Sequence, residues 1–128
     1  MCITKGYIES FLKDMKKLVS MDQYRIMGGK RRQDNIDLFI DYVMDENCAK
    51  SILLSLTPED FSKVLQNEHI GYEHELLYVF GKEVTLMKRF DSSEDTISLY
   101  IKLNRLENNF VIVVSFHIQK YPMEYMFK

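Results

Sequence analysis

The sequence is poor in the residues that mark secreted, metal-binding or disordered proteins. Among its 128 residues are only two cysteines and two prolines. Cys2 and Cys48 are too few for a disulfide framework and lack the spacing of a zinc site, so we expect reduced thiols, with Cys48 packed in a helix. Without a low-complexity run, disorder is expected only in short loops. No pattern indicates a bound metal or a cofactor.

The sequence also lacks an apolar stretch long enough to cross a bilayer. The longest such run, residues 110–116, has the length of a buried strand. The residues after Met1 include no apolar segment of the kind found in secretory signals. We therefore expect a cytoplasmic protein without membrane contact.

Charge is nearly balanced overall but unevenly distributed. The net charge of −2 argues weakly against a nucleic-acid partner. Between Lys13 and Arg32, however, basic residues clearly outnumber acidic ones. Two interpretations remain open: a solvated helix face followed by a loop, which such runs usually are, or a phosphate-facing patch in which Arg31 and Arg32 contact RNA.

Apolar spacing predicts helices in the first half of the chain. Residues 4–19 carry apolar side chains at helical intervals, and Thr4 is placed to cap this helix. Two further helices are expected at about 34–44 and 47–55. The residues expected to face the core from the helix at 34–44 are Ile36, Phe39, Ile40, Val43 and Met44.

Residues 57–60, Thr-Pro-Glu-Asp, have the features of another helix start. A threonine cap, a proline at the first position and acidic residues in the first turn are all typical of a helix N-terminus. The predicted helix directs Phe61, Val64 and Leu65 toward the core, and Lys63 lies outside this stripe.

From residue 72 onward the pattern changes to that of strands. Residues 75–80 and 83–87 are predicted to be extended, and a short strand or an extended connector is also expected at 23–27. Residues 96–104 and 110–118 alternate between their two faces, and a turn joins them into an antiparallel hairpin.

The two hairpin faces can be matched to each other. Apolar residues occupy the odd positions of the first strand and the even positions of the second. If these apolar faces share one side of the sheet, Tyr100, Lys102, Ser115 and His117 share the other. A turn centred near residue 107 or 108 then places Tyr100 opposite Ser115, with His117 as its diagonal neighbour.

Together these elements predict one α+β domain over residues 1–128, with N-terminal helices packed on an antiparallel sheet. The helical part is expected at about 1–68, the sheet at about 72–118, and a C-terminal tail at 119–128. A hydrophobic content of 46% is enough for a single core.

The polar face of the hairpin carries groups that suit metal-free RNA cleavage. In that reaction a base removes a 2′-hydroxyl proton, the oxygen attacks the adjacent phosphorus, cations stabilise the phosphate, and an acid protonates the leaving oxygen. His117, Tyr100 and Lys102 can fill these roles. Each also has a simpler interpretation, as a strand-end histidine, a packing tyrosine and a solubilising lysine.

The C-terminal tail is expected to add RNA contacts. Pro122 redirects the chain after the last strand, so the tail can bring basic and aromatic side chains near His117. These residues are Lys120, Tyr121, Tyr125 and Lys128. His69 and His74 have no common metal-pair spacing and are best interpreted as part of a solvated loop.

Four segments between residues 50 and 128 carry recognisable motifs. They are S-L-Y-I-K-L at 98–103 with V-V-S-F-H at 113–117, L-T-P-E-D-F-S-K at 56–63, Y-V-F-G at 78–81, and S-F-H-I-Q-K-Y-P-M-E-Y-M-F-K at 115–128. They resemble V-Y-[IL]-K-[IL] with I-S-F, L-[ST]-x-x-D-F-x-K, W-V-F-G and S-F-H-I-x-x-H-P-M-x-Y-P-F-K. These are motifs of the MqsR family of toxins, in its longer, Gram-positive-type branch.

The resemblance implies a RelE-like fold and a metal-independent, mRNA-cleaving toxin that a cognate antitoxin, of the DNA-binding helix-turn-helix type, blocks. By motif position, the family's helix lysine falls on Lys63 and its strand tyrosine on Tyr100. The residue after S-F, a lysine in shorter members and a histidine in this branch, falls on His117. The family's middle-strand glutamine has no counterpart in residues 75–77, and Tyr121 stands where the branch often has a second histidine.

We therefore expect a type II toxin with endoribonuclease activity. His117 is expected to be the general base or acid, and Tyr100 to orient the phosphate or act as the partner acid. Phosphate contacts are expected from Lys63, Lys102 and Lys120, with Arg31 and Arg32 binding RNA farther along. Two alternatives remain: a RelE-fold module that binds RNA or a protein without catalysis, and an unrelated structural or immunity-type protein.

Overall fold

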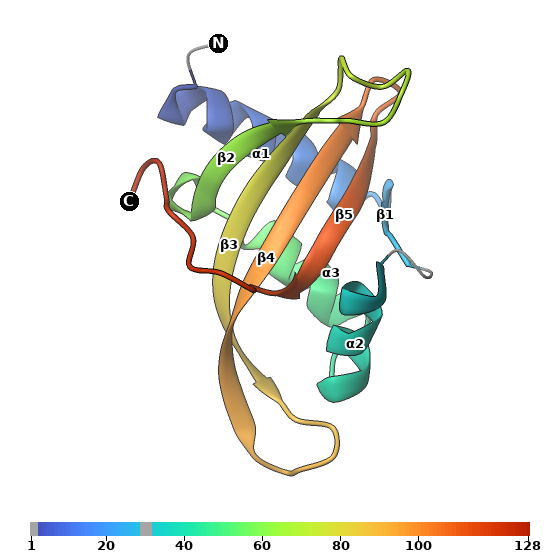
Figure 1. Cartoon of the computed structure of the whole chain (residues 1–128), viewed down its shortest axis with the longest axis vertical. Helices are drawn as coiled ribbons and strands as arrows, with labels where there is room; N and C mark the ends of the chain where they lie inside the picture. The colour runs from blue at the N-terminus through green and yellow to red at the C-terminus, as the bar shows by residue number, and fades with distance from the viewer. Residues whose placement is uncertain (1–2, 29–31) are drawn as a thin grey trace.

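The computed structural model describes residues 3–28 and 32–128, in which three helices accompany a five-stranded sheet (Figure 1). The helices are α1 (Lys5–Ser20), α2 (Gln33–Asp41) and α3 (Glu46–Leu54). The strands are β1 (Tyr24–Ile26), β2 (Phe61–Gln66), β3 (Leu76–Met87), β4 (Glu94–Leu106) and β5 (Phe110–Ile118). The α+β class is confirmed, and β1 falls within the extended segment expected at 23–27, but β2 lies in the part of the chain that was expected to be helical.

Helix α1 follows the amphipathic pattern of its sequence. The Thr4 hydroxyl accepts a hydrogen bond from the Tyr7 backbone N–H at 3.1 Å, which satisfies a free donor of the first turn. The Phe11 ring stacks on Tyr78 of β3 with ring centroids 3.9 Å apart, so the helix packs on the sheet. The buried residues of α1 are Ile8, Phe11, Leu12, Met15, Leu18 and Val19. The helix predicted at 4–19 is confirmed.

The strands form one sheet in the order β1-β5-β4-β3-β2. Strand β1 is parallel to β5, and all other neighbours are antiparallel. The expected antiparallel sheet is therefore correct for β2 to β5 and wrong for β1. No hairpin joins β1 to its neighbour, so its alternation pattern does not fix its direction.

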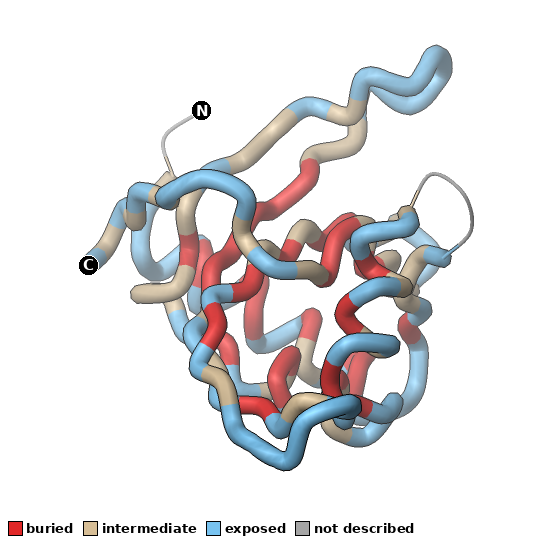
Figure 2. Tube along the Cα trace, turned by 60° about the horizontal axis from the view of Figure 1, so that its bottom comes forward, coloured by how far each residue is buried: buried red, intermediate tan, exposed pale blue. Residues whose placement is uncertain are grey.

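The core lies between the helices and one face of the sheet. Helices α1 and α3 lie behind the sheet in Figure 1, and residues 119–128 cross its opposite side, hereafter the open face. The buried segments of the chain gather in the interior (Figure 2). Phe61, Phe80 and Phe116 are fully buried there, and burying each contributes about 1.5–3 kcal/mol.

The predicted helix after Thr57 is wrong. The capping interaction forms, with the Thr57 backbone N–H donating to Asp60 Oδ2 at 2.9 Å, but it supports only the 3-10 turn Pro58–Asp60. The chain then continues as β2, whose Val64 and Leu65 pair with β3 and lie on opposite faces. Phe61 is buried as expected, whereas Leu65 faces the open side. Pairing with β3 satisfies the backbone of this segment in the strand conformation and overrides the local helix signal.

Helix α2 ends earlier than predicted and buries a different face. It stops at Asp41, and Arg89 donates hydrogen bonds to the carbonyl oxygens of Phe39, Ile40 and Tyr42. These bonds satisfy the free acceptors of the helix end, and Tyr42 then pairs with the sheet edge. The fully buried residues of the helix are Asn35 and Leu38, and Met44 is buried beyond it. Ile36 and Phe39 are half-buried, and Ile40 and Val43 are exposed.

The hairpin register differs from the predicted one. Tyr100 pairs with His117, and Lys102 pairs with Ser115. An irregularity in the register falls between Lys102 and Leu103, so Leu103 pairs with Val113. The turn closes between Leu106 and Phe110. The irregularity also reverses the faces of the first half of β5. Val111 and Val113 are buried on the core side, where residues 110, 112 and 114 were expected, and Ile112 and Val114 lie on the open face.

Two smaller expectations concern the membrane and the thiols. Within residues 3–28 and 32–128, no helix is both long and apolar enough to cross a membrane. Cys48 is a free, half-buried thiol in α3, and Asp45 caps this helix by accepting from the Cys48 backbone N–H at 2.8 Å. Cys2 lies outside the described residues.

Candidate active site

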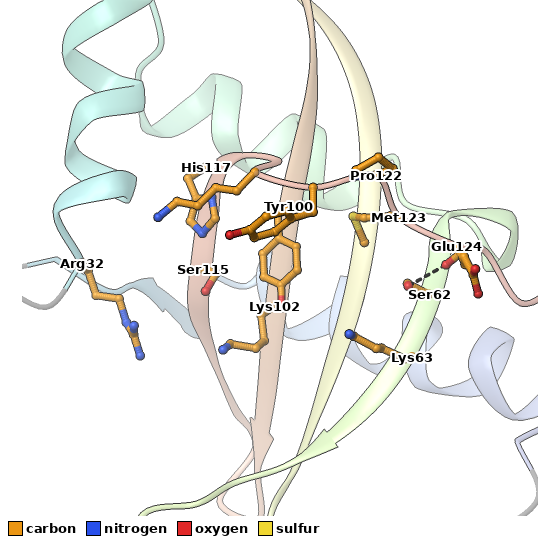
Figure 3. A pocket seen from close by; sticks show the side chains of 12 residues that line it. Arg32, Ser62, Lys63, Tyr100, Lys102, Ser115, His117, Pro122, Met123 and Glu124 are labelled. Carbon is orange, nitrogen blue, oxygen red and sulfur yellow. Dashed lines mark hydrogen bonds between the residues drawn. The ribbon is translucent and has the colours of Figure 1, made fainter.

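A hollow of about 700 Å³ opens on the open face of the sheet (Figure 3). Strands β2, β4 and β5, the start of α2 and the C-terminal segment all contribute to its walls. Its lining residues are Arg32, Ser62, Lys63, Tyr100, Lys102, Ser115, His117, Lys120, Tyr121, Pro122, Met123 and Glu124. The structure thus brings together seven of the ten residues predicted for the site.

Tyr100 and His117 form the centre of this hollow. They are directly paired across β4 and β5, and their rings stack with centroids 5.3 Å apart and an interplanar angle of 13°. The predicted shared face is confirmed, but the two residues are directly opposite rather than diagonal. The closer arrangement fixes both rings, because each limits the rotation of the other.

One hydrogen bond determines the proton arrangement of His117. Its Nδ1 lies 2.8 Å from the Ile118 carbonyl oxygen. A carbonyl oxygen only accepts, so Nδ1 carries a hydrogen and donates it. In the neutral ring Nε2 therefore holds the lone pair, which is the form required of a general base.

Burial changes the acidity of two neighbours of His117. Desolvation raises the pKa of the half-buried Tyr100 hydroxyl above its ordinary value of 10.0, so this group keeps its proton at neutral pH. Burial, and after it the charge of Arg32, lowers the pKa of Lys102 below 10.5. Lys102 thus gives up a proton more readily than an exposed lysine does.

Four cationic side chains line the hollow, namely Arg32, Lys63, Lys102 and Lys120, against one carboxylate, Glu124. Because these cations come from four separate elements, they surround the Tyr100–His117 pair rather than form a stripe. Such an arrangement attracts a phosphate. The positive charge is local, because the whole chain has a net charge of −2.

Lys63 reaches the hollow from β2, not from a helix as predicted. A register shift between Phe61 and Lys63 places Ser62 on the hollow as well. Ser62 donates from its hydroxyl to the Glu124 carbonyl oxygen at 2.6 Å, which fixes the C-terminal segment over this strand.

The C-terminal segment crosses the open face along defined contacts. The Gln119 side-chain amide donates to the Leu99 carbonyl oxygen at 3.1 Å. The Met126 backbone N–H donates to the Phe61 carbonyl oxygen at 3.1 Å. Lys120 forms an ion pair with Asp34 of α2 at 2.6 Å. Asp34 raises the pKa of Lys120, and Lys120 lowers the pKa of Asp34 in return. Tyr121 lines the hollow and is 79% exposed.

Tyr125 and Lys128 lie away from the hollow, contrary to expectation. The Tyr125 hydroxyl lies over Gly81 of β3, where an added Cβ would collide with it. The Lys128 ammonium group lies 5.1 Å from the centre of the Tyr125 ring. The absence of a side chain at Gly81 thus allows the segment to lie close to the sheet, and these two residues anchor it.

The basic cluster between Lys13 and Arg32 does not act as one patch. Lys13, Lys16 and Lys17 lie on α1, behind the sheet, which agrees with the solvated-face interpretation. Arg32 alone among the described members lines the hollow, and Arg31 lies outside the described residues. Within the described part of the chain, no group of three His, Cys, Asp or Glu residues is arranged to hold a metal.

The sequence prediction missed Asn35, which is only 2% exposed. Its side-chain Nδ2 donates to the carbonyl oxygens of Met27 at 2.9 Å and Val114 at 3.2 Å. Its Oδ1 accepts from the Phe116 backbone N–H at 2.8 Å. Asn35 thereby fixes α2 to the irregular part of β5, between Ser115 and His117. Asn35 lies three residues before the buried Leu38, and this helical spacing was the one sequence signal that could have indicated its burial.

Ser115 was expected on this face but not in the site. It is 4% exposed and pairs with Lys102 at the floor of the hollow.

Comparison of the chain with protein-family models, curated proteins and solved structures gave no match.

Proposed function

We propose that the protein is an endoribonuclease that cleaves mRNA by attack of a 2′-hydroxyl on the adjacent phosphorus. The observation that carries this proposal is the His117 ring. In its neutral form the ring presents the lone pair of Nε2, and it stacks on the Tyr100 ring within a hollow lined by four cations. Base, acid and phosphate-binding groups are thus present within one site.

The reaction follows from these positions. Nε2 of His117 takes the 2′-hydroxyl proton, and the oxygen forms a bond to phosphorus. Lys102 and Lys63 stabilise the added negative charge on the phosphate oxygens. The bond to the 5′-oxygen breaks, and this oxygen takes the proton of the Tyr100 hydroxyl. The products carry a 2′,3′-cyclic phosphate and a 5′-hydroxyl, and bulk water restores the protonation states of His117 and Tyr100.

The biological role that we propose rests on the sequence resemblance. The motifs at 56–63, 98–103 and 113–128 resemble those of MqsR-like toxins. The protein is accordingly the toxin of a type II toxin–antitoxin pair, acts in the cytoplasm, and is neutralised by an antitoxin of the helix-turn-helix type. The fold is expected to be RelE-like, and β2 replaces the helix that carries the lysine of the family motif.

A second candidate function is binding of RNA without catalysis. The net charge of −2 and the lack of a counterpart to the family's glutamine favour it. The two candidates predict different fates of the RNA, which is released as fragments in one case and intact in the other.

Incubation of the purified protein with a long mRNA in EDTA tests the proposal. We expect cleavage by the wild type and at least a 100-fold loss in His117→Ala, since proton transfer contributes about 10²- to 10⁴-fold. His74→Ala, in an exposed loop, is the matched control and should cleave normally. Equal cleavage by both variants would remove His117 from the mechanism, and binding without cleavage would support the second candidate. If no cleavage occurs, the same assay with translating ribosomes follows.

A further inference from the structure

A second hollow, of about 470 Å³, adjoins the candidate active site on the open face. Arg32 and Lys102 line both hollows. Lys102 and Asn104 are successive residues on the open face of β4, so their backbones lie about 7 Å apart, on the order of one nucleotide step. A chain whose phosphate occupies the first hollow therefore places a neighbouring nucleotide at the second.

The lining of the second hollow suits a nucleobase. Apolar side chains from strands β2, β3 and β5 and from the segment after β1 provide much of its surface: Met27, Leu65, Leu77, Ile112 and Val114. Amide and histidine side chains complete it: Gln66, Asn67, His69 and Asn104. An apolar surface with a few polar groups at its edge matches the flat faces and polar rim of a base.

Asn104 supplies the group that can distinguish one base from another. Its side chain is 6% exposed, and its Nδ2 donates to Glu75 Oε1 at 2.9 Å. Asn67 donates to the same oxygen at 3.1 Å. This contact fixes the amide, so the remaining atom, Oδ1, is an acceptor, and it is buried without a hydrogen-bond partner among the described residues. A buried acceptor without a donor is unfavourable, and a ligand that donates to it gains affinity.

We propose that the second hollow binds the nucleobase next to the scissile phosphate, and that Asn104 selects bases with an exocyclic amino group over uracil. An amino group projects beyond the ring and carries hydrogens, so it can reach an acceptor at the floor of the hollow. Uracil projects carbonyl oxygens at its edge, which repel Oδ1. This inference rests on the proposed function for its phosphate contacts, through Lys102 and Arg32.

Titration with single nucleotides tests the inference without requiring cleavage. Adenosine, cytidine and uridine 3′-monophosphates are added to the wild type, and affinities are measured by NMR chemical-shift changes. We expect adenosine and cytidine nucleotides to bind about fivefold more tightly than uridine, the factor for one hydrogen bond. The preference should disappear in Asn104→Ala. It should remain in Asn108→Ala, the matched control, which truncates an exposed asparagine of the β4–β5 turn outside this hollow.

A second variant covers the case in which Asn104→Ala does not fold. Val114→Phe fills the hollow without altering Asn104 and should weaken all three nucleotides. Equal wild-type affinity for the three nucleotides, or unchanged binding in Val114→Phe, would overturn the inference. RNA cleavage with no base preference in binding would leave the proposed function standing and remove this inference. Preferential binding of adenosine and cytidine nucleotides without RNA cleavage would support this inference and count against the proposed function.

Discussion

Asn35→Ala should destabilise the protein and also reduce its activity, because one side chain supports both the fold and the site. The amide makes three hydrogen bonds to the backbone, at Met27, Val114 and Phe116. The donor of the last bond is buried, and leaving such a group unpaired costs about 1–3 kcal/mol. With the two carbonyl oxygens partly reached by water, we expect a total loss of about 2–4 kcal/mol.

Urea denaturation followed by circular dichroism measures this loss as a lower midpoint with an unchanged slope. Against a typical domain stability of about 5–15 kcal/mol, the variant should still fold at room temperature. Its RNA cleavage should fall more than the folded fraction does, because Ser115 and His117 flank the freed Phe116. Gln33→Ala, on the exposed face of the same helix, is the control. A loss below about 0.5 kcal/mol, as expected for a surface change, would refute the reasoning.

Three further predictions concern the acid, the C-terminal segment and its ion pair. Tyr100→Phe keeps the stacked ring but removes the proton donor, so cleavage should fall about 10²- to 10⁴-fold with RNA affinity unchanged in a filter-binding assay. Gly81→Val places a branched side chain where the Tyr125 hydroxyl lies, so hydrogen exchange in residues 119–126 should accelerate while the core stays protected. Asp34→Asn should lower the melting temperature slightly near neutral pH. Because the pKa of Asp34 is lowered, the ion pair stabilises the fold above pH 3.8, and this stabilisation is lost as the pH falls further. Because the pKa of Lys120 is raised, the stabilisation is complete below pH 10.5 and is lost as the pH rises further. The difference in melting temperature between wild type and variant should therefore vanish at both extremes of pH.

Alternation and periodicity predicted much of this molecule. The spacing of Ile8, Phe11 and Leu12 gave helix α1, and the alternation of residues 96–104 gave the faces of β4. The same alternation placed Tyr100, Lys102, Ser115 and His117 on one face, which the structure confirms. These signals work because side-chain direction follows directly from the local backbone.

The failures arose where long-range contacts override local preference. The capped start at Thr57 is a good local helix signal, but pairing of β2 with β3 decides the conformation. The extra residue near Val114 moved the register and brought His117 opposite Tyr100. Nothing in the local sequence marks that irregularity, and the side chain that hydrogen-bonds to the backbone there, Asn35, lies far away in the chain.

The cleavage chemistry itself is tested most directly by removing the attacking oxygen. An oligoribonucleotide with an identified cleavage site is remade with a single 2′-deoxynucleotide on the 5′ side of the scissile phosphate. Both forms are incubated with the protein in EDTA. We expect the unmodified RNA to be cut to a 2′,3′-cyclic phosphate and a 5′-hydroxyl, and the substituted RNA to stay intact at that bond. Cleavage of the substituted RNA at the same bond would contradict the mechanism centred on His117.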